Sequence, residues 1–457
     1  MVTETNNGDF IEQQTALMHT VNTNEDWCED IALAMLSTVS HNVKFYSSMG
    51  QIDLNLWIIA VAPSSTGKST NFKNYVNPLL QKMKELGGNQ KTDYQFPSSF
   101  TVEAMTEYIS GEGNHNGIII RDEISSLFKE TSGKGYNVRL QEFLSELYDG
   151  KLSKRTTIAH GTTEPSYCYV TLLGGATPYL YSVLDKQIFV QGLGGRILWE
   201  VFPVVKREFD RNSFFNLTGL SKKDNEIEEA AKKLITLPSL DITIKINSDS
   251  EAALMLEQKH NKIEDRKKKL LDSDSLNLEG TYLGKLFVHL LKLSALKRLA
   301  RELPNINRDK GTSHSLMVEA MDVEWAINRI DKFHNNFLQM LKEWRTQPVE
   351  APIQSVANYR EKFLGVLKLQ GGIAKRPKLI ELLNWDSKRF GEITEMLKET
   401  GDVRILSKKE IKELKPELLN KCEIKLNNNL PQVFILTEYE IVEGEIKEVV
   451  GQEKPYS

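Results

Sequence analysis

Apolar positions in the first half of the chain predict buried strands that alternate with polar loops and helices. Leu56 to Val61 is an unbroken apolar run of strand length, and residues 117–123 (GIIIRDE) read as an apolar strand that ends in acids. A third strand is expected at Tyr169 to Leu173. Residues 27–39 carry apolar side chains at the spacing of one helix face and are expected to pack on this core. Together these segments predict an α/β fold.

The second half of the chain predicts helices. Tyr282 to Leu303 and Met317 to Trp344 are long amphipathic stretches, which are expected to pack together against the core as a helical subdomain. Residues 345–355 (RTQPVEAPIQS) contain prolines and are predicted to be a linker between domains.

A winged-helix pattern follows this linker. It consists of three helical stretches and then two strands, at 356–369, 378–383, 388–400, 403–406 and 432–437. Four domains are therefore predicted: an N-terminal helical segment (1–50), an α/β core (51–210), a helical subdomain (211–345) and a winged-helix domain (354–457).

Composition and charge exclude only a few classes of protein. The chain has 457 residues, 40% hydrophobic and 26% charged, with a net charge of −4, so any contact with nucleic acid must come from local patches. Its three cysteines are far apart and its histidines form no cluster, which gives neither a disulfide framework nor zinc-ligand spacing. The sequence shows no signal peptide and no apolar run that approaches a membrane span, so a cytoplasmic protein without membrane contact is expected.

The most informative stretch is residues 55–70, NLWIIAVAPSSTGKST. Strand, polar loop and helix follow one another in the order of a phosphate-binding loop, in which Lys68 reaches the β- and γ-phosphates and Ser69 binds Mg²⁺. The first glycine of the pattern G-x-x-x-x-G-K-[ST] is replaced by Ala62. The other interpretation is an ordinary Ser/Thr-rich turn that caps a helix. The predicted nucleotide contacts are Ala62, Pro63, Ser64, Ser65, Thr66, Gly67, Lys68, Ser69 and Thr70.

Two acids follow the second predicted strand and resemble a Walker B element. Asp122 is expected to hold Mg²⁺, mostly through water, and Glu123 to polarise the attacking water. Because ligands of open parallel sheets bind at the carboxyl ends of the strands, these acids are expected to meet the phosphate loop. Alternatively, they belong to the first turn of a helix, where acids are favourable.

Two further residues are candidates for contact with a γ-phosphate. Thr177 follows the strand that ends in GGATP, and it either senses the phosphate through its hydroxyl or caps the helix begun at Pro178. Arg196 follows Gly192, Gly194 and Gly195, which predict a flexible approach to an arginine finger acting in its own subunit or in a neighbouring one. The plain alternative for Arg196 is a surface arginine paired with an acid.

Basic residues on two segments are candidate DNA contacts. Lys154, Arg155 and His160 lie on or near a hairpin expected between strands at 156–159 and 167–173, where single-stranded DNA is bound by its phosphates or where the charges are simply solvated. Lys388 and Arg389 begin the third helix of the winged-helix pattern, in the position of a recognition helix. Winged helices also bind proteins, so this alternative stays open.

The order of these motifs resembles one family of P-loop proteins. APSSTGKST, FTVEAM, IIIRDE, LSELYDGK, VTLLGGATP, GLGGRILWEVFP and LGKLFVHLLKLSALKRLA follow one another over roughly residues 30–345. The family is a domain-of-unknown-function group found in phage, plasmid and integrated-element proteins, where it is often fused to primases. It is similar to replicative helicase ATPases. The resemblance implies a RecA/AAA+-like P-loop NTPase core and a Gly-rich arginine segment at Arg196.

The expected function is Mg²⁺-dependent hydrolysis of ATP that drives translocation on DNA or its unwinding, in replication of a mobile genetic element. The expected partners are single-stranded or duplex DNA and further copies of the chain in a homo-oligomeric ring. A nucleotide-gated DNA-binding initiator or regulator that does not unwind DNA is the main alternative. A small-molecule kinase is a third candidate function, but it would give no role to the glycine-rich turn before Arg196 or to the winged helix.

Overall fold

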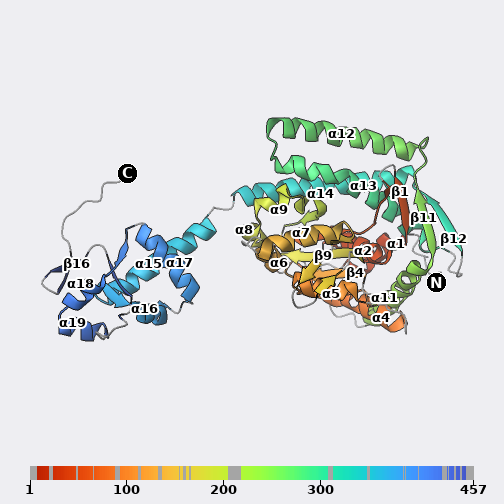
Figure 1. The fold of residues 1–457 in the computed structure, drawn as a ribbon. Helices are drawn as coiled ribbons and strands as arrows, with labels where there is room; N and C mark the ends of the chain where they lie inside the picture. The colour runs from red at the N-terminus through yellow and green to blue at the C-terminus, as the bar shows by residue number, and fades with distance from the viewer. Residues whose placement is uncertain are drawn as a thin grey trace. The chain divides into compact units, whose positions relative to one another are not determined.

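The computed structural model (Figure 1) describes residues 8–448 of the chain, with internal gaps. The gaps are 20–23, 48–49, 65, 88–92, 112–114, 132–135, 154, 158–160, 164–165, 204–217, 307–311, 347–349, 384, 386, 400, 425–429, 431, 437–438 and 443–444. The chain divides into two compact units, Met1–Thr346 and Gln347–Ser457. None of the helices in the described part of the chain combines the length and apolar character needed to cross a membrane.

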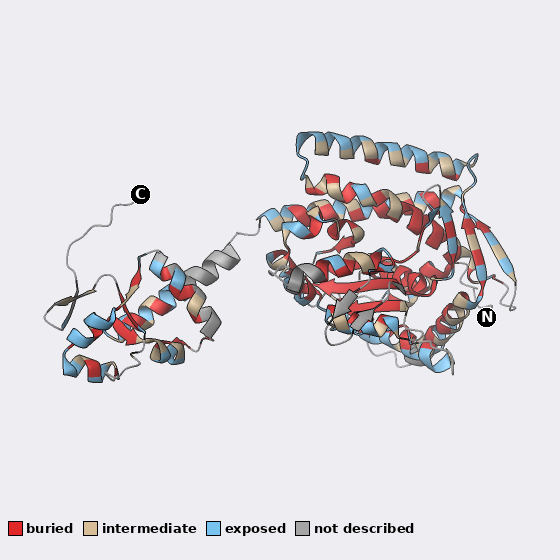
Figure 2. Cartoon of the chain, viewed as in Figure 1, coloured by how far each residue is buried: buried red, intermediate tan, exposed pale blue. Residues whose placement is uncertain are grey.

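A parallel four-stranded sheet lies at the centre of the first unit. Its strands, in spatial order, are β10 (Leu198–Val201), β3 (Trp57–Val61), β9 (Tyr169–Ala176) and β4 (Asn116–Arg121). Nearly every residue of these strands is buried, as the red sheet in Figure 2 shows. Sheets covered on both faces need such continuous apolar runs, which explains why the sequence pattern identified β3, β4 and β9.

Helices surround this sheet and share one hydrophobic core with it. The predicted helix at 27–39 is confirmed as α2 (Glu25–Val39), whose first turn is capped by the Asn24 side chain. The long helices α12 (Glu251–Ser273), α13 (Leu278–Glu302) and α14 (Ala320–Thr346) pack side by side (Figure 1). The first unit also contains α1 (Phe10–Met18), α5 (Val102–Ser110), α6 (Ser125–Thr131), α7 (Tyr136–Tyr148), α8 (Leu180–Val183), α9 (Lys186–Val190) and α11 (Thr218–Thr236).

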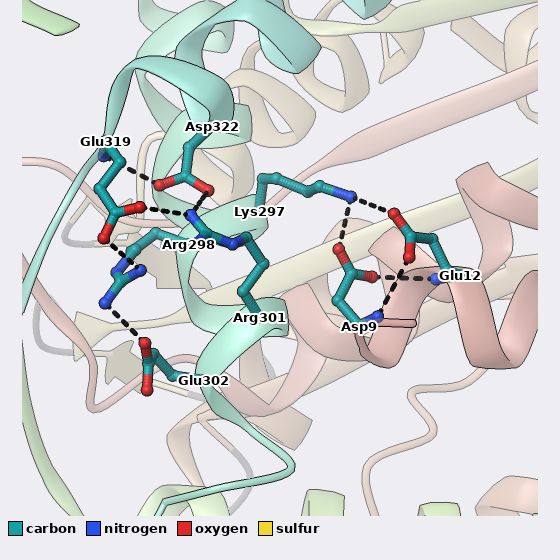
Figure 3. A network of polar contacts seen from close by, with 8 residues as sticks. All are labelled: Asp9, Glu12, Lys297, Arg298, Arg301, Glu302, Glu319 and Asp322. Atoms are coloured by element: carbon teal, nitrogen blue, oxygen red, sulfur yellow. Dashed lines mark hydrogen bonds and ion pairs between the residues drawn. The ribbon is translucent and has the colours of Figure 1, made fainter. Parts of the chain in front are cut away.

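Helix α1 is attached to α13 by a network of charged side chains (Figure 3). Asp9 and Glu12 form a capping box at the start of α1, and both carboxylates contact the ammonium group of Lys297. Further along α13, Arg301 bonds to Asp322 at 2.9 Å. The N-terminal segment is therefore part of the core of the first unit.

A second sheet joins parts of the chain that the sequence analysis assigned to separate domains. Its strands, in order, are β12 (Ser313–Met317), β11 (Asp241–Lys245), β1 (Lys44–Ser47) and β2 (Gly50–Gln51). The predicted divisions near residues 50 and 210 therefore do not separate compact units. Met317, which was expected to begin a helix, ends a strand instead.

The helix predicted after the phosphate-loop candidate is confirmed, and it is composite: α3 (Lys68–Asn71) continues through a π-helical turn (Phe72–Val76) into α4 (Asn77–Gly87). One local prediction in the first unit is corrected. The expected hairpin between 156–159 and 167–173 does not form, because residues 169–173 belong to the central sheet. Instead, β6 (Arg155–Thr157) pairs with β7 (Gly161–Thr163), and β5 (Lys151–Leu152) pairs with β8 (Ser166–Tyr167).

The second unit contains a small antiparallel sheet. Its order is β13 (Ile373–Lys375), β15 (Val433–Leu436) and β14 (Val403–Ile405), packed against α15 (Glu350–Leu369), α16 (Arg376–Leu383) and α17 (Ser387–Glu399). The predicted linker at 345–355 is largely helical, because α15 begins at Glu350 and accommodates Pro352 in its first turn. Elements beyond the predicted ones are α18 (Lys408–Glu413), α19 (Pro416–Lys421) and the hairpin of β16 (Tyr439–Val442) and β17 (Glu445–Glu448).

Candidate active site

The phosphate-loop candidate begins where β3 ends. The Ala62 N–H donates to the Ala176 carbonyl at 3.0 Å, and the Thr66 hydroxyl donates to the Pro63 carbonyl at 2.9 Å. Gly67 has a φ of +90° and immediately precedes α3, a left-handed conformation that favours glycine. Ala62 is buried in ordinary backbone, so the missing first glycine is accommodated without positive φ. Ser65 lies outside the described residues.

Lys68 is enclosed by its own loop. Its side chain is almost buried, and its Nζ donates to the carbonyls of Ala62 at 2.5 Å and Pro63 at 3.1 Å. Burial lowers the pKa of this amine, while the charges of Glu123 and Asp122 act in the opposite direction. A phosphate in this place would offer the ammonium group stronger, charge-assisted hydrogen bonds than these carbonyl oxygens do.

The two predicted acids meet the loop across the sheet edge. The Ser69 hydroxyl donates to Asp122 Oδ1 at 2.7 Å. The Glu123 carboxylate accepts from the backbone N–H of Ser125 at 3.1 Å and from that of Thr177 at 3.3 Å. Glu123 therefore accepts from the first N–H of α6 and at the same time faces the loop. Both acids precede α6, whose first turn contains no acid, so the alternative that places them in the first turn of a helix is wrong.

These groups line one cavity of about 340 Å³. Its lining residues are polar or glycine: Ser64, Thr66, Gly67, Lys68, Ser69, Thr70, Asp122, Glu123 and Thr177. A cavity with one lysine and a helix N-terminus among its described lining residues suits a chain of phosphates. Six of the nine predicted loop residues thus lie together with both acids and Thr177, whereas Ala62 and Pro63 do not line this cavity.

The oxygen atoms of this cavity fit a magnesium ion better than a metal held by protein alone. Within the described residues, no group of three or more histidine, cysteine or acidic side chains is placed to hold a metal. The Ser69 hydroxyl and the Asp122 carboxylate supply the kind of oxygen ligands that Mg²⁺ takes. Because Mg²⁺ is usually bound through one or two protein oxygens plus water and substrate phosphates, two such ligands are sufficient.

Thr177 does not cap the helix after it. Helix α8 begins at Leu180 with Tyr179 as its cap residue, and no side chain makes the capping bond. The Thr177 N–H instead donates a hydrogen bond to the Glu123 carboxylate, and Thr177 lines the cavity. The sensor role of the hydroxyl stays a prediction.

Arg196 lies at the opposite edge of the central sheet. Because Leu198 of β10 pairs in parallel with Ile58 of β3, the residues before β10 stand at the amino ends of the strands, whereas Lys68 follows their carboxyl ends. The Arg196 guanidinium donates from Nε and Nη2 to Asp149 at 3.1 and 2.6 Å, and from Nη1 to the Gly192 carbonyl at 2.9 Å. It does not line the cavity, so a finger acting on the site of its own chain is contradicted.

The glycines before Arg196 do not form a flexible approach, which corrects another expectation. Gly194 and Gly195 are buried in a short 3₁₀ turn. A Cβ on Gly194 would lie 2.2 Å from the Phe189 ring, and the Gly195 carbonyl lies 3.1 Å from His289 Nε2 on α13. These glycines allow the turn before Arg196 to pack closely against its neighbours, and this packing fixes the position of the turn.

The DNA-contact candidates stay predictions. Arg155 is on β6, and Lys388 and Arg389 are in the first turn of α17, but their side chains lie outside the described part of the structure. Lys154 and His160 also lie outside the described residues.

No protein-family model and no curated protein matches the chain.

One feature of the site was missed from the sequence, namely the role of Gly174 and Gly175 at the end of β9. Two adjacent glycines at the end of an apolar strand are a signal of close backbone approach.

Proposed function

We propose that the chain binds ATP with Mg²⁺ in the cavity at the carboxyl edge of the central sheet and hydrolyses it. The observation that carries this proposal is the convergence of Lys68, the Ser69–Asp122 pair and Glu123, which come from two strands separated by β9. Phosphoryl transfer needs little besides positioning and charge stabilisation, and this set of groups provides both.

Each residue has a distinct part in the proposed reaction. The Lys68 ammonium and the N–H groups at the start of α3 neutralise phosphate charge, and Ser69 and Asp122 hold the ion. When bound, Mg²⁺ supplies further charge neutralisation on the phosphate oxygens. Glu123, fixed by the Thr177 and Ser125 N–H groups, orients the attacking water and accepts a hydrogen bond from it.

The use of this hydrolysis is proposed from the sequence resemblance. We infer a RecA/AAA+-like P-loop core and, in the second unit, a winged helix formed by α15–α17 and the sheet β13-β15-β14. The work is translocation on DNA in replication of a mobile element, by a homo-oligomeric ring. If Arg196 acts as a finger, it does so on a neighbouring subunit and must first leave Asp149.

The test compares two site variants with two matched surface variants. Lys68→Ala is expected to abolish ATP binding, and Glu123→Gln to retain binding while losing turnover, measured by a fluorescent ATP analogue and phosphate release. Lys262→Ala and Glu257→Gln, both exposed on α12, are the controls and should behave as wild type. Wild-type binding in Lys68→Ala would refute the nucleotide site.

A second measurement separates the motor from the regulator. A motor is expected to show ATP hydrolysis stimulated by single-stranded DNA of any sequence, and rings of Glu123→Gln protein on DNA with ATP in electron micrographs. A regulator is expected to bind one duplex sequence and to hydrolyse slowly. Hydrolysis without any DNA response contradicts both.

A further inference from the structure

The end of strand β9 connects the two halves of the cavity. The Ala176 carbonyl accepts from the N–H of Ala62, where the phosphate loop begins. The Gly175 carbonyl accepts from the N–H of Ile124 at 2.8 Å, directly after the two acids, and the Thr177 N–H donates to Glu123. Gly175, Ala176 and Thr177 thus set the distance between the loop that carries Lys68 and the two acids.

Gly175 permits this arrangement because it has no side chain. A Cβ at this position would lie 2.7 Å from the backbone carbonyl oxygen of Asp122. Backbone cannot rotate away as a side-chain end can, so any larger residue displaces the Asp122 peptide. The φ of Gly175 is not positive, so the requirement is for space and not for a special conformation.

The neighbouring glycine makes a different contact. A Cβ on Gly174 would lie 2.8 Å from Cδ1 of Ile124, the terminal atom of a side chain. Such a contact can be relieved by moving or removing one methyl group. The two glycines therefore provide a severe and a mild version of the same perturbation, one against backbone and one against a side chain.

We propose that Gly175 is a positioning residue for magnesium binding, an inference that rests on the proposed function. Without a side chain at 175, the Asp122 peptide lies against β9 and its carboxylate reaches the Ser69 hydroxyl across the cavity, at 2.7 Å. A displaced peptide moves this carboxylate away from the position that it shares with Ser69.

The experiment measures how ATP binding depends on Mg²⁺ in the full chain carrying Gly175→Ala. The Mg²⁺ concentration for half-maximal binding of a fluorescent ATP analogue is expected to rise about 10- to 100-fold, as when an outer partner of a metal ligand is lost. Binding in EDTA is expected to change little, because Lys68 and the loop stay in place. Gly284→Ala is the matched control, since a Cβ there meets nothing within 4 Å. An unchanged Mg²⁺ requirement in folded Gly175→Ala overturns the proposal.

Gly174→Ala provides a test if Gly175→Ala does not fold. It is expected to raise the Mg²⁺ requirement by a smaller factor, and Ile124→Val, which removes Cδ1, is expected to restore it. A role in general stability alone predicts an unchanged Mg²⁺ requirement in the folded protein, so the measurement is made where circular dichroism shows that both variants are folded. An unchanged Mg²⁺ requirement in folded Gly174→Ala, or failure of Ile124→Val to restore a raised one, would overturn the proposal.

These outcomes are distinguishable from failure of the proposed function itself. If wild-type protein binds no ATP at any Mg²⁺ concentration, the nucleotide site is wrong. If wild-type protein binds ATP with a normal Mg²⁺ requirement and the glycine variants do the same, only the positioning role is wrong.

Discussion

Glu200 is a buried carboxylate whose surroundings disfavour its negative charge. Replacing it should therefore raise the free energy of unfolding at alkaline pH. It lies on β10 with 2% of its surface exposed, and Arg329 Nη2 is 4.0 Å from its Oε2. Asp26, Glu29 and Asp30 contact the same guanidinium more closely. Burial raises the pKa of Glu200 to about 7, because loss of hydration outweighs the attraction of an arginine shared with three other acids.

The sign of the pH effect follows from this raised pKa. The folded state binds the proton more tightly than the unfolded chain, in which Glu200 has its ordinary value of 4.5. The stability contributed by this residue is therefore full below about pH 4.5, falls as the pH rises to about 7, and is constant above that. At about 1.4 kcal/mol per pH unit, the difference amounts to about 3 kcal/mol.

Glu200→Gln keeps the shape of the protonated side chain and removes this dependence. We expect the variant to match wild type near pH 4.5 and to exceed its free energy of unfolding by up to about 3 kcal/mol at pH 8. Arg329 retains three carboxylate partners in the variant, so no buried cation is left unpaired. The assay is denaturant unfolding of the first unit, followed by tryptophan fluorescence at several pH values.

The comparison must be a difference between variants, because other carboxylates titrate in the same range. Glu257→Gln, on the exposed face of α12, is the control for the effect of a Glu→Gln substitution outside the buried cluster. The reasoning is refuted if Glu200→Gln is less stable than wild type at pH 8, since Arg329 would then favour the charged form more than burial disfavours it.

Three further predictions concern single contacts. Asp9→Ala removes the cap of α1 and a buried partner of Lys297, so the free energy of unfolding should fall by about 3 kcal/mol, measured by denaturant unfolding. Arg196→Ala and Asp149→Ala should each lower the melting temperature without changing ATP affinity, since their paired hydrogen bonds lie at the far edge of the sheet. Glu410 has a pKa lowered to about 2 by its Ser407 capping bonds, so the destabilisation by Glu410→Gln should be full above pH 4.5 and shrink as the pH falls toward 2.

The sequence predicted the elements of the site well because their signals are local. An apolar run, a polar loop with Gly67 and a helix start are neighbours in the chain, and the same holds for β4 and its acids. Thr101 is another case of a local feature, because it caps α5 through its own side chain. Such features depend on backbone conformation and side-chain type within a few residues, and folding of distant segments does not change them.

The second sheet could not be assembled from the sequence for the opposite reason. Residues 44–47, 241–245 and 313–317 pair in parallel although long segments separate them. The alternation in Asp241–Lys245 (DITIK) is a strand signal, yet nothing in it names the partner strand. Ser313–Met317 is an edge strand with mostly exposed or half-buried side chains, so its composition differs little from that of a loop.

The direction of the parallel strands explains which candidate residues reached the cavity and which did not. Lys68, Asp122 and Thr177 each come after a strand, and parallel strands deliver such residues to the carboxyl edge. Arg196 comes before β10, so the same rule sends it to the amino edge, whatever its chemical suitability for a phosphate. A cation supplied to this cavity by Arg196 therefore requires the amino edge of a neighbouring subunit's sheet to face it.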